Sequence, residues 1–443
     1  MGEKAPRRWY PTLMIVMCIK LILQAAISFR AAPKSIHIAF SSFVAVKNQA
    51  IPTYKSISRW LTQVGLYKLN CLKEQATDWA LIIDNSVQIG SHKFLVILGV
   101  RLSKFQGRAL TFEDMEMLVM EIHEKSDTES VCKALEKAQK KVGKVAMVCA
   151  DDGPDLRGGI ALFCKEHNVG RVFDIIHKIG TFLKKFLEKD PEWQAFTCAA
   201  AEAKRKMQQT QAAHLAPPNQ RTKSRFLNIE ILTHWGIDIL AALESPKHPN
   251  KALIEKYCGW IRQHKELLER LKQMALISQK ARQHIRERGI CATTGDQIDT
   301  VLERATELSN FNEQACEYAG MLIDFCREQS KIVPVGQVWI GSSEIIESLF
   351  GKLKSLEQDQ SKGGFTSLVL AAAACVGKVD ANIVSAAMRQ ISTADVDTWT
   401  KEQIGQTVLS KRREALGSWR KPKRTGDIIH EQAGILLRDA AGF

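Results

Sequence analysis

The sequence lacks the short motifs of several large enzyme and metal-binding classes. Its eleven cysteines form no CxxC pair and no Cys/His ligand spacing, which predicts free thiols in a reducing cytosol, with no zinc site and no disulfide framework. Walker A loops, dinucleotide-binding glycine fingerprints and a Ser-His-Asp order are absent, so ATP, NAD and serine-hydrolase chemistry have no support. The apolar stretch from Leu13 to Ile27 contains Lys20 and Gln24 and no small-residue cleavage site. Because it is also too short to span a bilayer, we expect a buried helix and a cytoplasmic protein without membrane contact.

Acidic residues are scarce in the first seventy residues, which carry ten Lys and Arg against a single acid, Glu3. The formal net charge of the whole chain is +14, so this segment holds most of the excess. Such a field attracts polyanions, of which nucleic acid is the commonest. The segment therefore indicates a DNA-binding head.

Three helices are predicted in this head: residues 11–27, a second helix capped by Ser28 and ending near Phe40, and a third beginning at Thr53. Basic and hydroxyl side chains gather at the start of the third helix, as in the recognition helix of a helix-turn-helix. The alternative is a helical bundle with a solvated basic face. The candidate DNA contacts are Arg30, Lys55, Ser56, Ser58 and Arg59.

The stretch 79–100 predicts a hairpin of two buried strands, with Asp84 ending the first strand. A carboxylate at that position either begins a turn or, if buried, needs a partner such as a metal ion. Further elements follow in order: a helix over 110–123 with an edge strand near 108–110 as an option, a helix at 129–142, a strand at 144–150, a helix at 156–167 and a short strand ending near Asp174. This order predicts an α/β fold, a mixed sheet with helices packed on it.

Three carboxylates occupy related places in this pattern. Asp84 and Asp151 each end a predicted strand, and Glu347 lies on a helix that follows a long helical stretch. Three like charges cannot cluster at neutral pH unless a cation neutralises them, so a cluster here predicts divalent metal binding. Two Mg²⁺ ions about 3.5–4 Å apart, with Mn²⁺ able to substitute, would suit phosphoryl transfer at such a site.

Several motifs then resemble one family. The segment ADDGPDL around Asp151, the segment IIDNS around Asp84 and the segment SSEIIESLFGKLK around Glu347 resemble the three acid motifs of DDE-type insertion-sequence transposases. Those enzymes have an RNase H-like core of the retroviral integrase superfamily. The basic N-terminal segment resembles their DNA-binding head, and FDIIHK resembles the acid-x-x-His motif of Mutator-like and related transposases. The resemblance implies metal binding by Asp84, Asp151 and Glu347.

The same resemblance implies auxiliary roles for other side chains. Lys352 or Lys354 would face phosphate, and Asp174 with His177 would form the acid-x-x-His pair, although such a pair is often only a helix cap and a solvated ring. Trp235 would stack on a flipped base or lie in a core. For two of the three metal ligands the sequence leaves a nearby acid as an alternative: Asp151 or Asp152, and Glu344 or Glu347.

The spacing of 196 residues between Asp151 and Glu347 implies a helical insertion in the core. We therefore expect a helix-turn-helix head at 1–72, the first part of the RNase H-like core at 77–190, a helical insertion at 191–335, the glutamate helix at 336–360 and a basic helical tail at 361–443. Its expected function is that of a bacterial, nucleoid-associated transposase, a homodimer or higher oligomer that cleaves terminal inverted repeats and joins the 3′-hydroxyl to target DNA. The alternatives are a catalytically inactive DNA-binding relative and an RNase H-fold nuclease without strand transfer.

Overall fold

The computed structural model describes residues 9–42, 50–89, 92–105, 107–123, 127–151, 153–220, 226, 229–306, 311–358, 365–406 and 408–417. Its centre is a five-stranded mixed sheet of order β3-β2-β1-β4-β5. Strands β1 (Ala76–Ile89), β2 (His92–Arg101) and β3 (Glu116–His123) form an antiparallel meander. Strands β4 (Gly143–Ala150) and β5 (Gly170–Phe173) continue the sheet in parallel from β1. The predicted α/β class, a mixed sheet with helices packed on it, is thereby confirmed.

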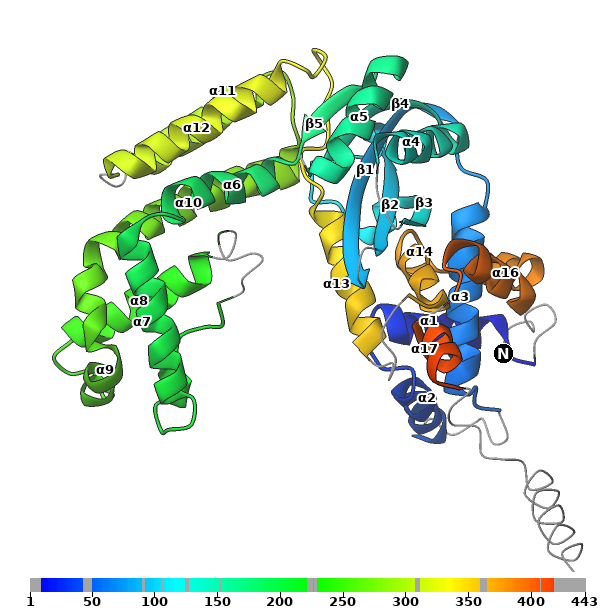
Figure 1. Cartoon of the computed structure of the whole chain (residues 1–443), viewed down its shortest axis with the longest axis horizontal. Helices are drawn as coiled ribbons and strands as arrows, with labels where there is room; N and C mark the ends of the chain where they lie inside the picture. The colour runs from blue at the N-terminus through cyan, green and yellow to red at the C-terminus, as the bar shows by residue number, and fades with distance from the viewer. Residues whose placement is uncertain are drawn as a thin grey trace, which may run out of the picture.

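Side chains of β1 alternate between two hydrophobic cores. Trp79, Leu81 and Ile83 belong to the core beneath α4 (Thr128–Val142) and α5 (Pro154–His167), the two helices that cover one face of the sheet in Figure 1. Side chains at even positions of β1, such as Ile82, belong to the core on the opposite face. Because the side chains of a strand alternate with period two, Asp84 points to that opposite face.

Two predictions about this sheet are wrong. Asp84 does not end its strand, since β1 continues to Ile89 and pairs Asp84 with Val96 of β2. The predicted helix over 110–123 is a 3-10 turn (Phe112–Asp114) followed by strand β3, and residues 108–110 form no strand. Leu, Met and Glu favour helices locally, but pairing with β2, which lies earlier in the chain, overrides that weak preference.

The opposite face carries helices from both ends of the chain. The three N-terminal helices are present as α1 (Thr12–Leu23), α2 (Ala31–Ser42) and α3 (Tyr54–Asn70). From Trp60 to Leu69 every residue of α3 is buried except Tyr67, which is half-buried. Helix α3 contacts α14 (Ala371–Cys375), α15 (Ala381–Gln390) and α16 (Thr393–Gln403). A Cβ atom added to Gly65 would lie 2.0 Å from the carbonyl oxygen of Leu370. The predicted head and tail therefore pack into one helical bundle.

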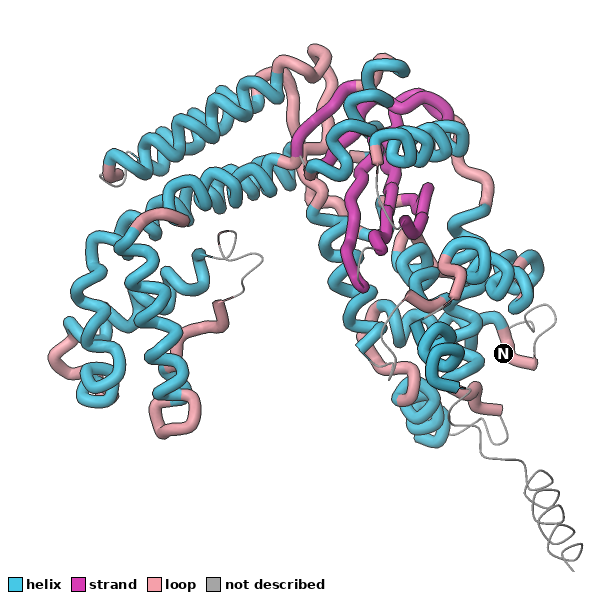
Figure 2. The backbone as a smooth tube through the Cα atoms, in the orientation of Figure 1, coloured by secondary structure: helices cyan, strands magenta, loops and turns pink. Residues whose placement is uncertain are grey.

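Among the described residues of the insertion between β5 and the glutamate helix, the regular elements are helices, apart from one isolated bridge between Ile290 and Trp339. Figure 2 shows the strands gathered in one part of the molecule, while this insertion extends from them as an arm of helices and loops. Among the described residues, no helix combines the length and apolar character needed to cross a bilayer. The remaining helices are α6 (Ile175–Leu187), α7 (Pro191–Met207), α8 (Ile229–Glu244), α9 (Lys251–Cys258), α10 (Lys265–Arg288), α11 (Thr294–Thr306), α12 (Glu313–Ser330), α13 (Glu344–Gln358) and α17 (Val408–Gly417).

Candidate active site

Two aspartates meet where β1 and β4 part. The parallel register pairs Ile82 with Cys149, and Asp84 and Asp151 are each two residues further along their chains. Adjacent strands lie about 4.8 Å apart, so this register brings the two carboxylates together. The backbone N–H of Asn85 donates to Asp84 Oδ1 at 2.6 Å, and that of Gly153 donates to Asp151 Oδ1 at 3.1 Å. Local backbone bonds therefore hold both side chains.

The glutamate arrives on α13, which contacts β1 on the face toward which Asp84 points. The start of α13 is fixed by Asp174, whose Oδ2 accepts hydrogen bonds from the backbone N–H of Ser343 at 3.1 Å and from its hydroxyl at 2.5 Å. Glu347 lies four residues after Ser343, which is one helical turn. The chain that leaves the sheet after β5 and the chain that returns to it are thus joined beside the acids.

Mutual pKa effects connect the three carboxylates. Burial, followed by the negative charge of Asp151, raises the pKa of Asp84 to about 7, and Glu347 adds to the rise while the Asn85 N–H opposes it. Partial burial and the charges of Asp174, Glu344 and Asp151 raise the pKa of Glu347, and His177 acts in the opposite direction. Such shifts are expected of like charges that share one site. Asp84, Asp151 and Glu347 therefore form one electrostatic cluster.

The cluster has the donor chemistry of a hard divalent cation, because all three groups are carboxylates. Their oxygen atoms are nevertheless not all within 4.8 Å of one another. Among the described residues, a different set has ligand atoms that close together: Cys132, Glu136 and Glu166. Burial and the charge of Asp151, which raise the pKa of Asp84, make a negative charge on Asp84 costly. A metal ion would offset this charge and draw the three carboxylates closer together.

The choice between Glu344 and Glu347 has a structural basis. Arg286, near the end of α10, donates from Nε to Glu344 Oε2 at 2.6 Å and also pairs with its second carboxylate oxygen. This ion pair uses both oxygens of Glu344. The geometry therefore favours Glu347 as the metal ligand. Asp152, the other open alternative, lies outside the described residues.

The acid-x-x-His pair divides between two roles. Asp174 is buried and caps α6, since its Oδ1 accepts from the N–H groups of Ile176 at 2.8 Å and His177 at 3.0 Å. The side chain of His177 is exposed and close enough to lower the pKa of Glu347. The capping alternative thus holds for Asp174, while His177 faces the acid cluster. The bond between Asp174 and Ser343 joins residues 169 positions apart, so no local sequence pattern predicts it.

The predicted DNA contacts of the head lie where α3 is exposed. Lys55 and Arg59 are exposed, and Ser56 and Ser58 are half-buried. The Arg30 guanidinium lies 5.9 Å from the centre of the Tyr54 ring, so Arg30 belongs to the same surface. This surface is available to DNA even though the rest of α3 is buried.

The other predicted contacts are separated by the fold. Lys354 is exposed and lies seven residues after Glu347, on the same side of α13. Lys352 is half-buried, and its Nζ lies 5.2 Å from the centre of the Phe112 ring. Trp235 lies on α8 in the arm, donates from Nε1 to the Leu215 carbonyl at 3.0 Å and packs on Trp260. Lys354 is therefore the better phosphate candidate, and Trp235 has the packing contacts of a core residue.

Comparison with known proteins finds similarity in structure but not in sequence. No protein-family model and no curated sequence matches the chain. Among solved structures, the chain is similar to the Drosophila P element transposase strand transfer complex, with a TM-score of 0.41 and 12% sequence identity. The alignment covers 87% of this chain and 94% of that chain.

Proposed function

We propose that this chain is a DNA transposase whose RNase H-like core cleaves a phosphodiester at each transposon end and joins the freed 3′-hydroxyl to target DNA. The observation that carries the proposal is the convergence of Asp84, Asp151 and Glu347, two from adjacent strands and one from a helix that returns after the insertion. Carboxylates whose pKa is raised by burial and by neighbouring acids, as for Asp84 and Glu347, are candidates for a functional site.

Asp84, Asp151 and Glu347 would hold two Mg²⁺ ions. When bound, such ions activate water or a 3′-hydroxyl and stabilise the leaving oxygen of an in-line displacement. The protein's part is positioning: backbone N–H groups orient both aspartates, and the Asp174–Ser343 bond fixes the helix that bears the glutamate. Preorganised ligands of this kind keep reacting groups in productive geometry.

Basic side chains would guide the DNA to these acids. Lys354 lies on the side of α13 that carries Glu347. Lys55 and Arg59 are exposed on α3, and Arg30 is exposed just before α2. Lysine and arginine contacts to phosphate supply affinity and position without reading sequence. Because two ends must be processed together, the active form would be a dimer or a higher oligomer.

A cleavage assay tests the proposal. The substrate is a supercoiled plasmid carrying the genomic DNA from both sides of the coding sequence, incubated with the full-length protein and Mg²⁺. We expect the wild-type protein to nick the flanking DNA at the transposon ends. Asp84→Asn should not nick it, and both proteins should bind the plasmid equally. Normal cleavage by Asp84→Asn would refute the assignment of the acids.

Strand transfer is tested separately with pre-cleaved ends, which supply the 3′-hydroxyl, and a second plasmid as target. Joined products support a transposase. Hydrolysis without joining would replace the proposal by a nuclease of the same fold, and binding without either reaction by an inactive DNA-binding relative.

A further inference from the structure

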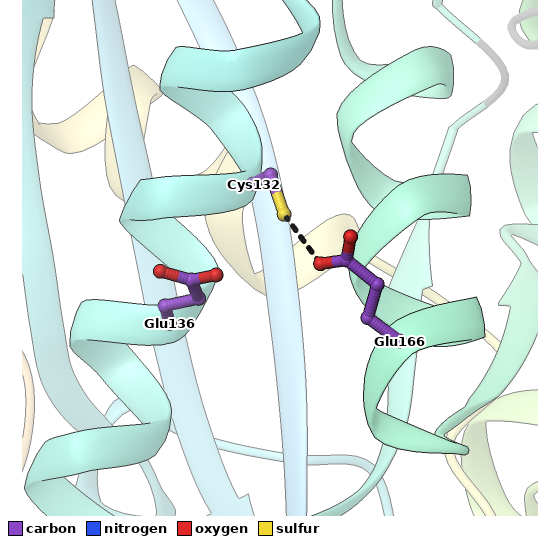
Figure 3. A group of neighbouring side chains, drawn as sticks. All are labelled: Cys132, Glu136 and Glu166. Atoms are coloured by element: carbon purple, nitrogen blue, oxygen red, sulfur yellow. Dashed lines mark hydrogen bonds between the residues drawn. The ribbon is translucent and has the colours of Figure 1, made fainter.

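A second cluster of metal-binding atoms lies between α4 and α5, apart from the acids described above. Cys132 and Glu136 are one turn apart on α4, and Glu166 is in the last turn of α5 (Figure 3). Cys132 Sγ lies 4.0 Å from Glu166 Oε2. The sulfur and one carboxylate oxygen of each glutamate all lie within 4.8 Å of one another. Ligand atoms from two packed helices therefore converge on one point.

A histidine stands beside this cluster in a fixed orientation. His167 Nε2 lies 4.0 Å from Glu136 Oε1. Its Nδ1 is 3.2 Å from Gln139 Nε2, and its ring packs on Phe163 with 4.7 Å between the ring centres. As placed, the Gln139 amide N–H donates to Nδ1, whereas a metal-binding histidine donates its other ring N–H to an acceptor, which the oxygen of the same amide can supply. Contacts to Gln139 and Phe163 thus direct Nε2 toward Glu136.

We propose that Cys132, Glu136, Glu166 and His167 form a Zn²⁺ site that joins α4 to α5. Thiolate, imidazole and carboxylate donors suit zinc, whereas the all-carboxylate set of the other site suits Mg²⁺. In a tetrahedral site, Zn–S and Zn–O bonds place sulfur and oxygen roughly 3.5 Å apart. The observed 4.0 Å between Cys132 Sγ and Glu166 Oε2 is close to that separation. The His167 ring, whose Nε2 lies 4.0 Å from Glu136 Oε1, would have to move toward the other three ligands to complete the coordination.

Proton balance gives the site a definite pH dependence. Burial and the charges of Glu136 and Glu166 raise the pKa of the Cys132 thiol, and zinc binds only the deprotonated form. Zinc forms its bond to sulfur while the thiol proton leaves to solvent, and affinity therefore increases with pH. The Gln139 amide must turn its oxygen toward Nδ1, because the proton then resides on Nδ1 and the Nε2 lone pair is free for the metal.

The lack of CxxC pairs and of Cys/His ligand spacing predicted no zinc site. The ligands here are a cysteine and a glutamate four residues apart on one helix and an adjacent Glu–His pair on another. Only the packing of α4 on α5 brings them together.

Cobalt serves as the spectroscopic probe. Full-length protein is treated with EDTA under reducing conditions and titrated with Co²⁺ in the presence of excess Mg²⁺. We expect a thiolate-to-cobalt charge-transfer band that saturates at one equivalent and disappears on addition of Zn²⁺. A wild-type protein that shows no such band would overturn the proposal.

Variants assign the band to its ligands. Cys132→Ser should abolish it, while the matched Cys198→Ser, at an exposed cysteine of α7, should keep it; a band that survives in Cys132→Ser overturns the proposal. Because the side chain of Glu166 is exposed, Glu166→Gln leaves folding intact and should weaken Co²⁺ binding at least about tenfold. Gln139→Ala should weaken it about tenfold to a hundredfold, as for other residues that orient a metal-bound histidine. Asp84→Asn should retain the band, which separates this site from the proposed catalytic acids.

Discussion

Ser343 donates its hydroxyl hydrogen bond to Asp174 across 169 residues of chain, at 2.5 Å and in a buried environment. Asp174 is at the same time the cap of α6, where the insertion leaves the sheet. One carboxylate therefore ties the start of the insertion to the start of the glutamate helix. The position of Glu347 then depends on this bond rather than on the course of the long arm.

Ser343→Ala should displace Glu347 from its position without unfolding the protein. The substitution leaves Asp174 Oδ2 with the Ser343 backbone N–H as its remaining donor from that residue, and losing a hydrogen bond to a buried charged acceptor costs about 1–3 kcal/mol. Urea unfolding should show this loss of stability. The cleavage assay should show a higher Mg²⁺ requirement, since a displaced ligand weakens metal binding.

Ser348→Ala is the matched control, because Ser348 is exposed on the same helix, one residue after Glu347. It should change neither stability nor Mg²⁺ requirement. If Ser343→Ala loses stability but keeps the wild-type Mg²⁺ requirement, the bond is structural only and does not position Glu347.

Glu347→Gln and Glu344→Gln should behave differently. Loss of a metal ligand removes several kcal/mol of transition-state stabilisation, so Glu347→Gln should reduce cleavage at least about a hundredfold with DNA binding unchanged. Glu344→Gln instead breaks the partly exposed ion pair with Arg286, which is worth about 1 kcal/mol or less. Its cleavage rate should stay within about tenfold of wild type, and Arg286→Gln should match it. If Glu344→Gln instead reduced cleavage far more than Glu347→Gln, Glu344 would be the metal ligand.

The parts of the fold that the sequence predicted correctly are the local ones. The hairpin and the strand that runs into Asp151 follow from apolar runs of strand length. The prediction of a helix at strand β3 is wrong because the strand is stabilised by pairing with β2, which local sequence preferences do not reflect. Likewise, the partners of Asp174 and Glu344 lie 169 and 58 residues away. Such contacts arise from tertiary packing, and no spacing rule encodes them.

The buried Lys68 should make the free energy of unfolding depend on pH in the alkaline range. Lys68 donates to the carbonyl oxygens of Ala374, Val376 and Gly377. Burial lowers its pKa from 10.5 to about 8, an effect that the charge of Glu116 partly opposes. Between these values the unfolded chain binds more protons than the folded one, so the free energy of unfolding should rise with pH. The cost of burying the charged amine is complete below about pH 8 and disappears as pH increases toward 10.5.

Urea unfolding across this range, compared with Lys68→Met, measures the effect. The wild type should gain on the order of 3 kcal/mol relative to the variant between pH 8 and 10.5. Lys141, whose pKa burial also lowers to about 8, remains in both proteins and cancels in the comparison. Parallel pH profiles would show that Lys68 keeps its ordinary pKa. At pH 7, Lys68→Met should be less stable than wild type, because the three carbonyl oxygens lose a common donor.

The exposed start of α3 should reveal itself through the salt dependence of DNA binding. Lys55 and Arg59 are both exposed there. Each phosphate contact to duplex DNA contributes about 0.9 to the slope of log affinity against log salt concentration, so the double variant Lys55→Gln/Arg59→Gln should lower the slope by nearly 2. Fluorescence anisotropy with a labelled duplex at several salt concentrations gives this slope. The control Lys133→Gln/Lys137→Gln removes the same charge from exposed positions on α4, on the other face of the sheet, and should leave the slope unchanged. Equal losses in both double variants would mean that DNA responds only to net charge and that the first turns of α3 are not a contact surface.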